Sequence, residues 1–122
     1  MGKTILTVDD SASMRQMIKM TLSGAGYDVI EAGDGAQGLA AARGAPVSMV
    51  LTDLNMPVMD GVTLVRELRK LPSLTGVPII LVTTESDAAK KAEAKAAGAT
   101  GWITKPFQPE QLLSLAKKVL GQ

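Results

Sequence analysis

The stretch MVLTDLNMPVMDG, residues 49–61, sets the pattern on which the fold depends. Its first four residues, 49–52, predict a β-strand, and Asp53 follows directly. A loop containing Pro57 and Gly61 then leads into a helical spacing of apolar residues. The stretch therefore predicts a strand, a sharply turning loop and a helix, with a carboxylate where the strand ends.

The same alternation of strand and helix continues in both directions from this stretch. The predicted strands lie at residues 5–8, 29–30, 49–52, 77–83 and 100–104. A helical pattern follows each strand, with predicted caps at Ser13 (a capping box with Gln16), Asp34 and Ser86 and with Pro109 opening the last helix. Strict alternation with short connections predicts βαβ units, and right-handed crossovers then give a parallel sheet covered on both faces.

Composition limits the possible chemistry. The chain has 122 residues, the size of one domain, and 13 Lys and Arg against 12 Asp and Glu leave a formal charge of +1. This balance offers no basic footprint for nucleic acid. Cys and His are both absent, so the chain has no disulfide framework, no thiolate and no histidine general base. The N-terminal apolar run is too short for a signal peptide or a spanning helix, and a cytoplasmic location is expected.

Polar residues stand where the predicted strands end. They are Asp9 and Asp10, Asp53, Thr83, and Lys105, whereas the second strand contributes only Glu31. Each alone has an ordinary explanation as a helix cap, a turn residue or a surface charge. In open α/β sheets, however, ligands bind at the carboxyl ends of the strands. Three carboxylates against one ammonium leave a net charge of −2, which one Mg²⁺, or Mn²⁺ as a substitute, would cancel.

Four features together resemble the receiver domains of two-component response regulators over essentially the whole chain. They are the acid pair Asp9-Asp10, the segment 52–61, the strand-end Thr83 and the run Lys105-Pro106-Phe107. The resemblance implies a flavodoxin-like (βα)5 doubly wound parallel sheet with strand order 2-1-3-4-5, the order known for the family member CheY. It also implies that residues 1–122 form a single receiver domain without an output domain.

The resemblance assigns roles to the reacting groups. Asp53 is implied to be the phosphoacceptor, which takes a phosphoryl group from a phosphohistidine on a CheA-like sensor histidine kinase. Lys105 and Thr83 are implied to contact phosphoryl oxygens, so that positioning and electrostatics supply most of the catalysis. The bond between Lys105 and Pro106 is expected to be cis. Apart from its own phosphorylation and dephosphorylation, the protein is not expected to be an enzyme.

The resemblance also implies a ligand set for the metal. Mg²⁺ is expected to be bound by the carboxylates of Asp10 and Asp53 and by the backbone carbonyl of Asn55, while Asp9 acts through an ordered water. Asn55 and Glu85 are expected to tune how fast the aspartyl phosphate hydrolyses.

Phosphorylation is expected to move a switch formed by Thr83 and Trp102, the only Trp of the chain. The implied output surface comprises the helix 87–97, the strand 100–104 and the last helix. It carries the lysines Lys90, Lys91, Lys95, Lys117 and Lys118. This face either docks an acidic or amphipathic segment of a partner or is an ordinary solvated helix face.

The expected role is that of a single-domain regulator in chemotaxis, with a flagellar motor switch protein as one candidate effector. A monomer is expected, without nucleic-acid or membrane partners. One alternative is a phosphate sink or phosphorelay intermediate that has no effector of its own. A remote alternative is a phosphohydrolase of the haloacid dehalogenase type, which would place its two aspartates two positions apart, whereas Asp9 and Asp10 are adjacent.

Overall fold

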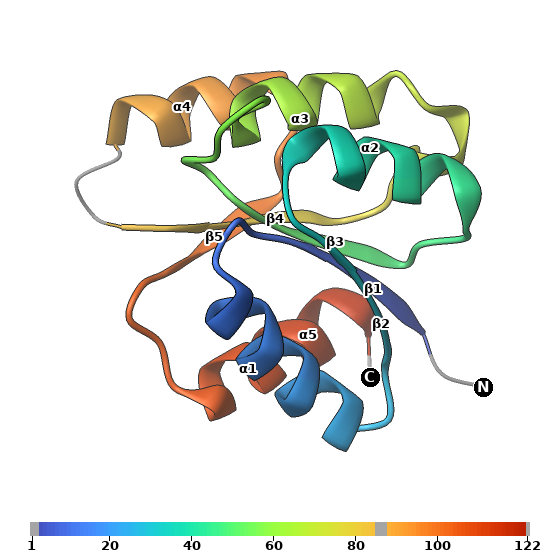
Figure 1. The fold of residues 1–122 in the computed structure, drawn as a ribbon, viewed down its shortest axis with the longest axis vertical. Helices are drawn as coiled ribbons and strands as arrows, with labels where there is room; N and C mark the ends of the chain where they lie inside the picture. The colour runs from blue at the N-terminus through green and yellow to red at the C-terminus, as the bar shows by residue number, and fades with distance from the viewer. Residues whose placement is uncertain (1–2, 85–87, 122) are drawn as a thin grey trace.

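The protein forms three layers, with helices on both sides of a central β-sheet (Figure 1). The computed structural model describes residues 3–84 and 88–121. Within these residues the strands are β1 Thr4–Val8, β2 Asp28–Ala32, β3 Met49–Asp53, β4 Ile79–Thr83 and β5 Gly101–Thr104. The helices are α1 Ala12–Gly24, α2 Gly35–Gly44, α3 Gly61–Arg69, α4 Ala88–Ala97 and α5 Pro109–Leu120, with a 3-10 turn, η1, at Pro72–Leu74. The 5-stranded sheet is parallel, and its order β2-β1-β3-β4-β5 confirms the predicted flavodoxin-like fold.

Two apolar cores fill the space on the two faces of the sheet. Helices α1 and α5 cover one face, and α2, α3 and α4 cover the other (Figure 1). Successive residues of a strand point to opposite faces, so Ile5 packs into the core beneath α1 and α5 while Leu6 packs into the other core. Strands β3 and β4 are buried along their whole length because both of their faces are covered. None of the helices in the described part of the chain is both long and apolar enough to cross a membrane.

The start of α1 differs from the predicted one. Ser11 is the N-cap, and its Oγ accepts the N–H of Met14 at 3.3 Å. The predicted capping box of Ser13 and Gln16 is therefore wrong. An N-cap is the residue just before the first residue of a helix. Because α1 begins at Ala12, Ser13 lies inside the helix and cannot cap it.

The other helix ends are closer to their predictions. Asp34 caps α2 and Pro109 opens α5, as predicted. Helix α3 ends at Arg69, and Pro72 opens the 3-10 turn that follows it. Ser86, the predicted cap of α4, lies outside the described residues.

Candidate functional site

The carboxyl ends of the strands bring the predicted functional residues to one edge of the sheet. Strands β1 and β3 pair in a register that places Asp9 and Asp53 at adjacent positions. On the other side of β3, Thr83 is the last residue of β4, and its carbonyl accepts the N–H of Lys105 at 2.7 Å. Residues from four segments that are distant in sequence are therefore held together by backbone pairing.

The acidic residues form a cluster. One carboxylate oxygen each from Asp9, Asp10 and Asp53 lies within 4.8 Å of the others. Asp9 and Asp53 are buried, with 1% and 7% of their surface exposed, and Asp10 is exposed. Burial raises the pKa of Asp9, and the charges of Asp53 and Asp10 raise it further, while the Ser11 N–H and Lys105 act in the opposite direction. Like charges at this spacing favour a bound cation.

Asp9 shows how a metal ion fits this cluster. Its Oδ1 accepts the Ser11 N–H at 2.9 Å. Its Oδ2 is buried and has no hydrogen-bond partner within the described structure. A buried carboxylate oxygen without a partner is costly. Oxygen donors without His or Cys suit Mg²⁺, which keeps several waters and takes few carboxylates, so the residues present fit this ion.

The carboxylate of Asp53 is held by two donors. Its Oδ1 accepts the Leu54 N–H at 2.8 Å, and the Lys105 Nζ lies 3.3 Å from the same oxygen. The peptide bond between Lys105 and Pro106 is cis, which confirms the expectation from the sequence. The carboxylate of Asp53 and the ammonium of Lys105 therefore form an ion pair at the edge of the sheet.

Gly61 and Val58 have unusual backbone environments in the loop that follows Asp53. The Gly61 N–H donates to the Leu54 carbonyl at 2.9 Å. A Cβ at Gly61 would lie 2.6 Å from the carbonyl oxygen of Asp53, so only glycine fits. Val58 has φ of +70°, an unusual value for a β-branched residue, and it is 82% exposed. The predicted loop-shaping role of Gly61 thus has a steric basis, whereas the position of Val58 could not be recognised from its residue type.

The predicted switch residues occupy different environments. Thr83 is buried, with 2% of its surface exposed, and its Oγ1 lies 3.3 Å from the Thr84 carbonyl. Trp102 is 46% exposed, and the Lys91 Nζ lies 5.3 Å from the centre of its ring. Glu85, expected to tune hydrolysis, lies outside the described residues.

Two basic residues reach the site that the sequence did not assign to it. The Lys90 Nζ, from the first turn of α4, donates to the Asn55 Oδ1 at 2.8 Å. On the other side, Arg15 of α1 donates to the backbone carbonyl of Asp9. The signal that could have revealed Lys90 is its place in the first turn of a helix, where cations are disfavoured.

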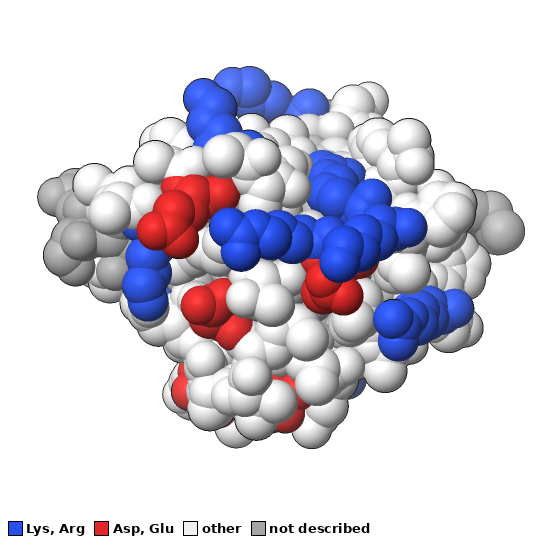
Figure 2. All heavy atoms as spheres, turned by 90° about the horizontal axis from the view of Figure 1, so that it is seen from above, with Lys and Arg blue, Asp and Glu red and all other residues white. Residues whose placement is uncertain are grey.

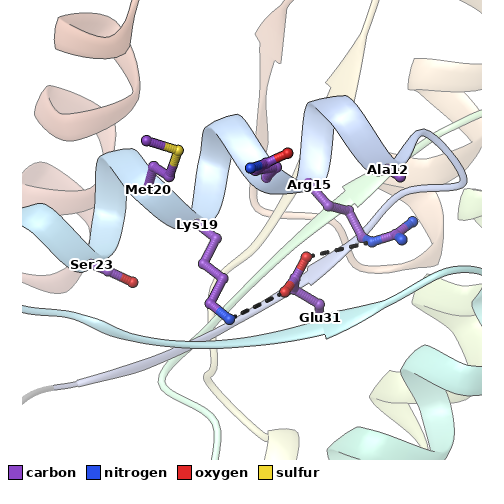
Figure 3. A pocket seen from close by; sticks show the side chains of 7 residues that line it. Ala12, Arg15, Lys19, Met20, Ser23 and Glu31 are labelled. Carbon is purple, nitrogen blue, oxygen red and sulfur yellow. Dashed lines mark ion pairs between the residues drawn. The ribbon is translucent and has the colours of Figure 1, made fainter.

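Arg15 is itself held by a charged network beside a pocket along α1 (Figure 3). Its Nε lies 3.6 Å from Glu31 Oε1, and the Lys19 Nζ lies 3.4 Å from Glu31 Oε2. Glu31, which the sequence placed after the second strand, lies within β2 and does not join the acid cluster. It orients Arg15, which contacts the backbone of the acid pair.

Comparison with known proteins identifies the family. The chain matches the response regulator receiver domain over residues 5–117. It is 41% identical over 119 residues to the chemotaxis protein CheY1 of Helicobacter pylori, covering 96% of both chains. The structure of Vibrio cholerae chemotaxis protein CheY4 superposes with a TM-score of 0.94 at 46% identity, over 98% of this chain and 100% of that one.

A third relative carries a metal. The receiver domain of the Pseudomonas aeruginosa sensor histidine kinase PA1611, described with a magnesium ion coordinated in its active site cleft, has a TM-score of 0.91 at 29% identity, with 100% of both chains covered. The matched family is a regulatory domain rather than an enzyme family. With its sheet order, its strand-end acids and this similarity to CheY proteins, the chain belongs to the response regulator receiver domains of two-component signalling.

Proposed function

We propose that residues 1–122 form one CheY-like receiver domain whose Asp53 accepts a phosphoryl group from a phosphohistidine of a CheA-like sensor histidine kinase. One observation carries the proposal: Lys105 Nζ lies 3.3 Å from the buried Asp53 carboxylate, inside a cluster of three acids. At this position the ammonium group of Lys105 can contact an oxygen of a phosphoryl group that approaches Asp53. The similarity to CheY proteins makes chemotaxis the signalling context we favour.

The transfer is a simple displacement at phosphorus. A carboxylate oxygen of Asp53 forms the new bond to phosphorus, the bond from phosphorus to the histidine nitrogen breaks, and imidazole leaves with the electron pair. Lys105 holds one phosphoryl oxygen, and the Thr83 hydroxyl contacts another. The negative charge of the transition state lies mainly on these oxygens, so fixed positive charge lowers the barrier.

The acid cluster would hold Mg²⁺ through the carboxylates of Asp10 and Asp53 and the backbone carbonyl of Asn55, with Asp9 acting through water. When bound, this ion would offset the charge of the acids and of the phosphoryl group. The unpartnered Oδ2 of Asp9 and the magnesium described in the related PA1611 receiver support this assignment. Mn²⁺ would substitute, because it takes the same oxygen ligands.

The output surface is proposed to lie on α4, β5 and α5. A groove there is lined by Ala88, Lys91, Ala92, Lys95 and Trp102. Figure 2, which looks onto the layer of α2, α3 and α4, shows basic side chains spread across that face with acidic ones among them. An apolar floor edged by lysines suits an acidic or amphipathic segment of an effector.

In the proposed switch, Thr83 moves toward the phosphoryl group and Trp102 leaves its exposed position. Asn55 and Glu85 would tune how fast the aspartyl phosphate hydrolyses. The protein is proposed to act as a monomer in the cytoplasm, where it would meet both the kinase and the effector.

The acceptor is tested by intact mass. The protein is incubated with Mg²⁺ and acetyl phosphate, and one added phosphoryl group is expected. Asp53→Asn is expected to abolish the gain, and Asp10→Asn to reduce it strongly by weakening the metal site. Asp28→Asn, an exposed aspartate at the opposite end of the sheet, is the matched control and should label normally. Labelling of the Asp53 variant at the full rate would contradict the proposal.

The output surface is tested separately. Beryllofluoride with Mg²⁺ should change the Trp102 fluorescence of the parent protein but not that of Asp53→Asn. Substituting Lys91 and Lys95 by Gln should weaken capture of the natural effector by the activated protein. Unchanged capture would contradict the proposal that the groove binds the effector, but it would not affect the proposal that Asp53 is phosphorylated.

A further inference from the structure

Lys90 is a second cation beside the acceptor loop, and it approaches from a different element than Lys105 does. Its Nζ donates to the Asn55 Oδ1 at 2.8 Å, across 35 residues of sequence. Asn55 lies two positions after Asp53, in the loop between β3 and α3. The charge of Lys90 also contributes to lowering the pKa of Asp60 at the other end of this loop. The ammonium group therefore lies beside the loop that directly follows Asp53.

The location of Lys90 is not explained by the stability of its own helix. Within the described residues, α4 runs from Ala88, and its first turn, which includes Lys90, contains no acidic residue. The helix dipole favours anions at this end and disfavours cations. Lys90 is exposed, so it supplies no core packing either. A residue that breaks a local rule without a compensating gain in packing is a candidate for function.

We propose that Lys90 is a cation that recognises the phosphodonor. Its ammonium group donates to Asn55 in the absence of a donor, and it binds the phosphoryl group when an anionic donor arrives. The inference rests on the proposed function and adds a residue to the recognition of its substrate. An ammonium on a flexible four-carbon stem can exchange one oxygen acceptor for another without moving the backbone. A phosphoryl group offers several charged acceptors, which bind an ammonium more strongly than the single neutral amide oxygen of Asn55 does.

Lys105 and Lys90 would act at different steps of the reaction. Lys105 is partly buried and already contacts Asp53, so it acts at the reacting centre. Lys90 is at the solvent-facing side, where a positive charge raises the local concentration of an anionic donor and the rate of its encounter. Exposed charges are screened within about 10 Å at 0.1 M salt, so the contribution of Lys90 must fall as the salt concentration rises.

The test is the rate of phosphorylation by acetyl phosphate, in which the Asp53 oxygen bonds to phosphorus, the bond from phosphorus to the acyl oxygen breaks and acetate leaves. The rate at subsaturating donor is measured by intact mass at saturating Mg²⁺, at low and at high salt. Lys90→Gln, which keeps an N–H donor for Asn55 but loses the charge, is expected to be about threefold to tenfold slower at low salt. The difference should nearly vanish at about 1 M salt, where the screening length is near 3 Å.

Two further variants test whether a positive charge at position 90 is what raises the rate. Lys90→Arg keeps the charge and should retain most of the rate. Lys70→Ala removes one exposed cation at the far end of α3, where Lys70 pairs with Glu67, and should leave the rate unchanged. A Lys90→Gln rate equal to that of the parent, or an equal loss in Lys70→Ala, would overturn the inference. The proposed function would then still stand if the parent is labelled on Asp53, whereas an unlabelled parent would overturn both.

Discussion

The Lys105 Nζ and the Asp53 Oδ1 lie 3.3 Å apart although 52 residues separate them in sequence. Backbone pairing produces this contact: Asp53 ends β3, and the N–H of Lys105 is bound to the carbonyl of Thr83 at the end of β4. The loop that begins after Asp53 is held in turn by Leu54 and Gly61. Backbone pairing within the sheet therefore positions the two side chains that we propose to act in phosphoryl transfer.

Asp9 is expected to destabilise the metal-free protein. Its pKa is raised by burial, so the folded state holds the proton more tightly than the unfolded state does. Stability from this group is therefore present below its ordinary pKa of 3.8 and is lost as the pH rises through the raised value. Asp9→Asn should raise the free energy of unfolding at pH 7 in EDTA by about 1–2 kcal/mol, because it removes a buried charge.

Urea unfolding at several pH values checks this expectation. Asp9→Asn should lack the loss of stability that the parent shows as the pH rises above 3.8. Added Mg²⁺ should stabilise the parent more than the variant, because binding to the folded state alone adds to its stability. A variant that is less stable than the parent in EDTA at pH 7 would contradict the role assigned to Asp9.

Asp60 is expected to give the opposite pH dependence. Its Oδ1 accepts the Thr63 N–H at 2.9 Å and caps α3, and this bond lowers the pKa of Asp60 below 3.8. The stabilisation is therefore complete above pH 3.8 and is lost as the pH falls through the lowered value. Asp60→Ala should cost about 1 kcal/mol at pH 7 and less at low pH. Asp60→Asn should keep most of the cap, and equal losses in the two variants at pH 7 would argue against capping.

Gly61 is expected to tolerate no side chain. In Gly61→Ala the new Cβ would meet the Asp53 carbonyl at 2.6 Å and the Leu54 Cα at 2.8 Å, and both of these are backbone atoms. The loop must move, so the substitution should cost about 2–3 kcal/mol and slow phosphorylation of Asp53. Gly24→Ala is the matched control, because a Cβ there meets nothing within 4 Å and the residue ends α1. Thermal unfolding should show Gly24→Ala to be neutral or slightly stabilising.

Val58 is expected to be strained. It has φ of +70° and is 82% exposed, so it has a costly backbone conformation and little burial in return. Val58→Asn should stabilise the protein by about 1 kcal/mol, since Asn adopts positive φ more readily. Val58→Ala, which removes the β-branch but keeps the steric penalty of a Cβ, should change stability less. A less stable Asn variant in urea unfolding would show that the strain is absent.

The sheet and the acid cluster could be predicted because each depends on local patterns. A parallel sheet follows from the alternation of strands and helices, whereas its strand order was implied by the resemblance to receiver domains. Asp9 and Asp53 were found because each directly follows an apolar run. The contacts of Lys90 and Arg15 could not be predicted, because a long side chain reaches across elements and its direction is set by packing. Lys90 was assigned to an outward helix face, yet it contacts Asn55. Trp102 is 46% exposed with Lys91 of α4 over its ring, an environment that the sequence of β5 alone could not reveal.

Asp53 is the residue that we propose to carry the phosphoryl group. The most direct measurement treats the protein with Mg²⁺ and acetyl phosphate, then reduces it with borohydride, which converts an aspartyl phosphate into homoserine. Peptide mapping should find homoserine at position 53 alone, and none when acetyl phosphate is omitted. Homoserine at Asp9 or Asp10 with position 53 unmodified, or no homoserine in the labelled protein, would contradict the account.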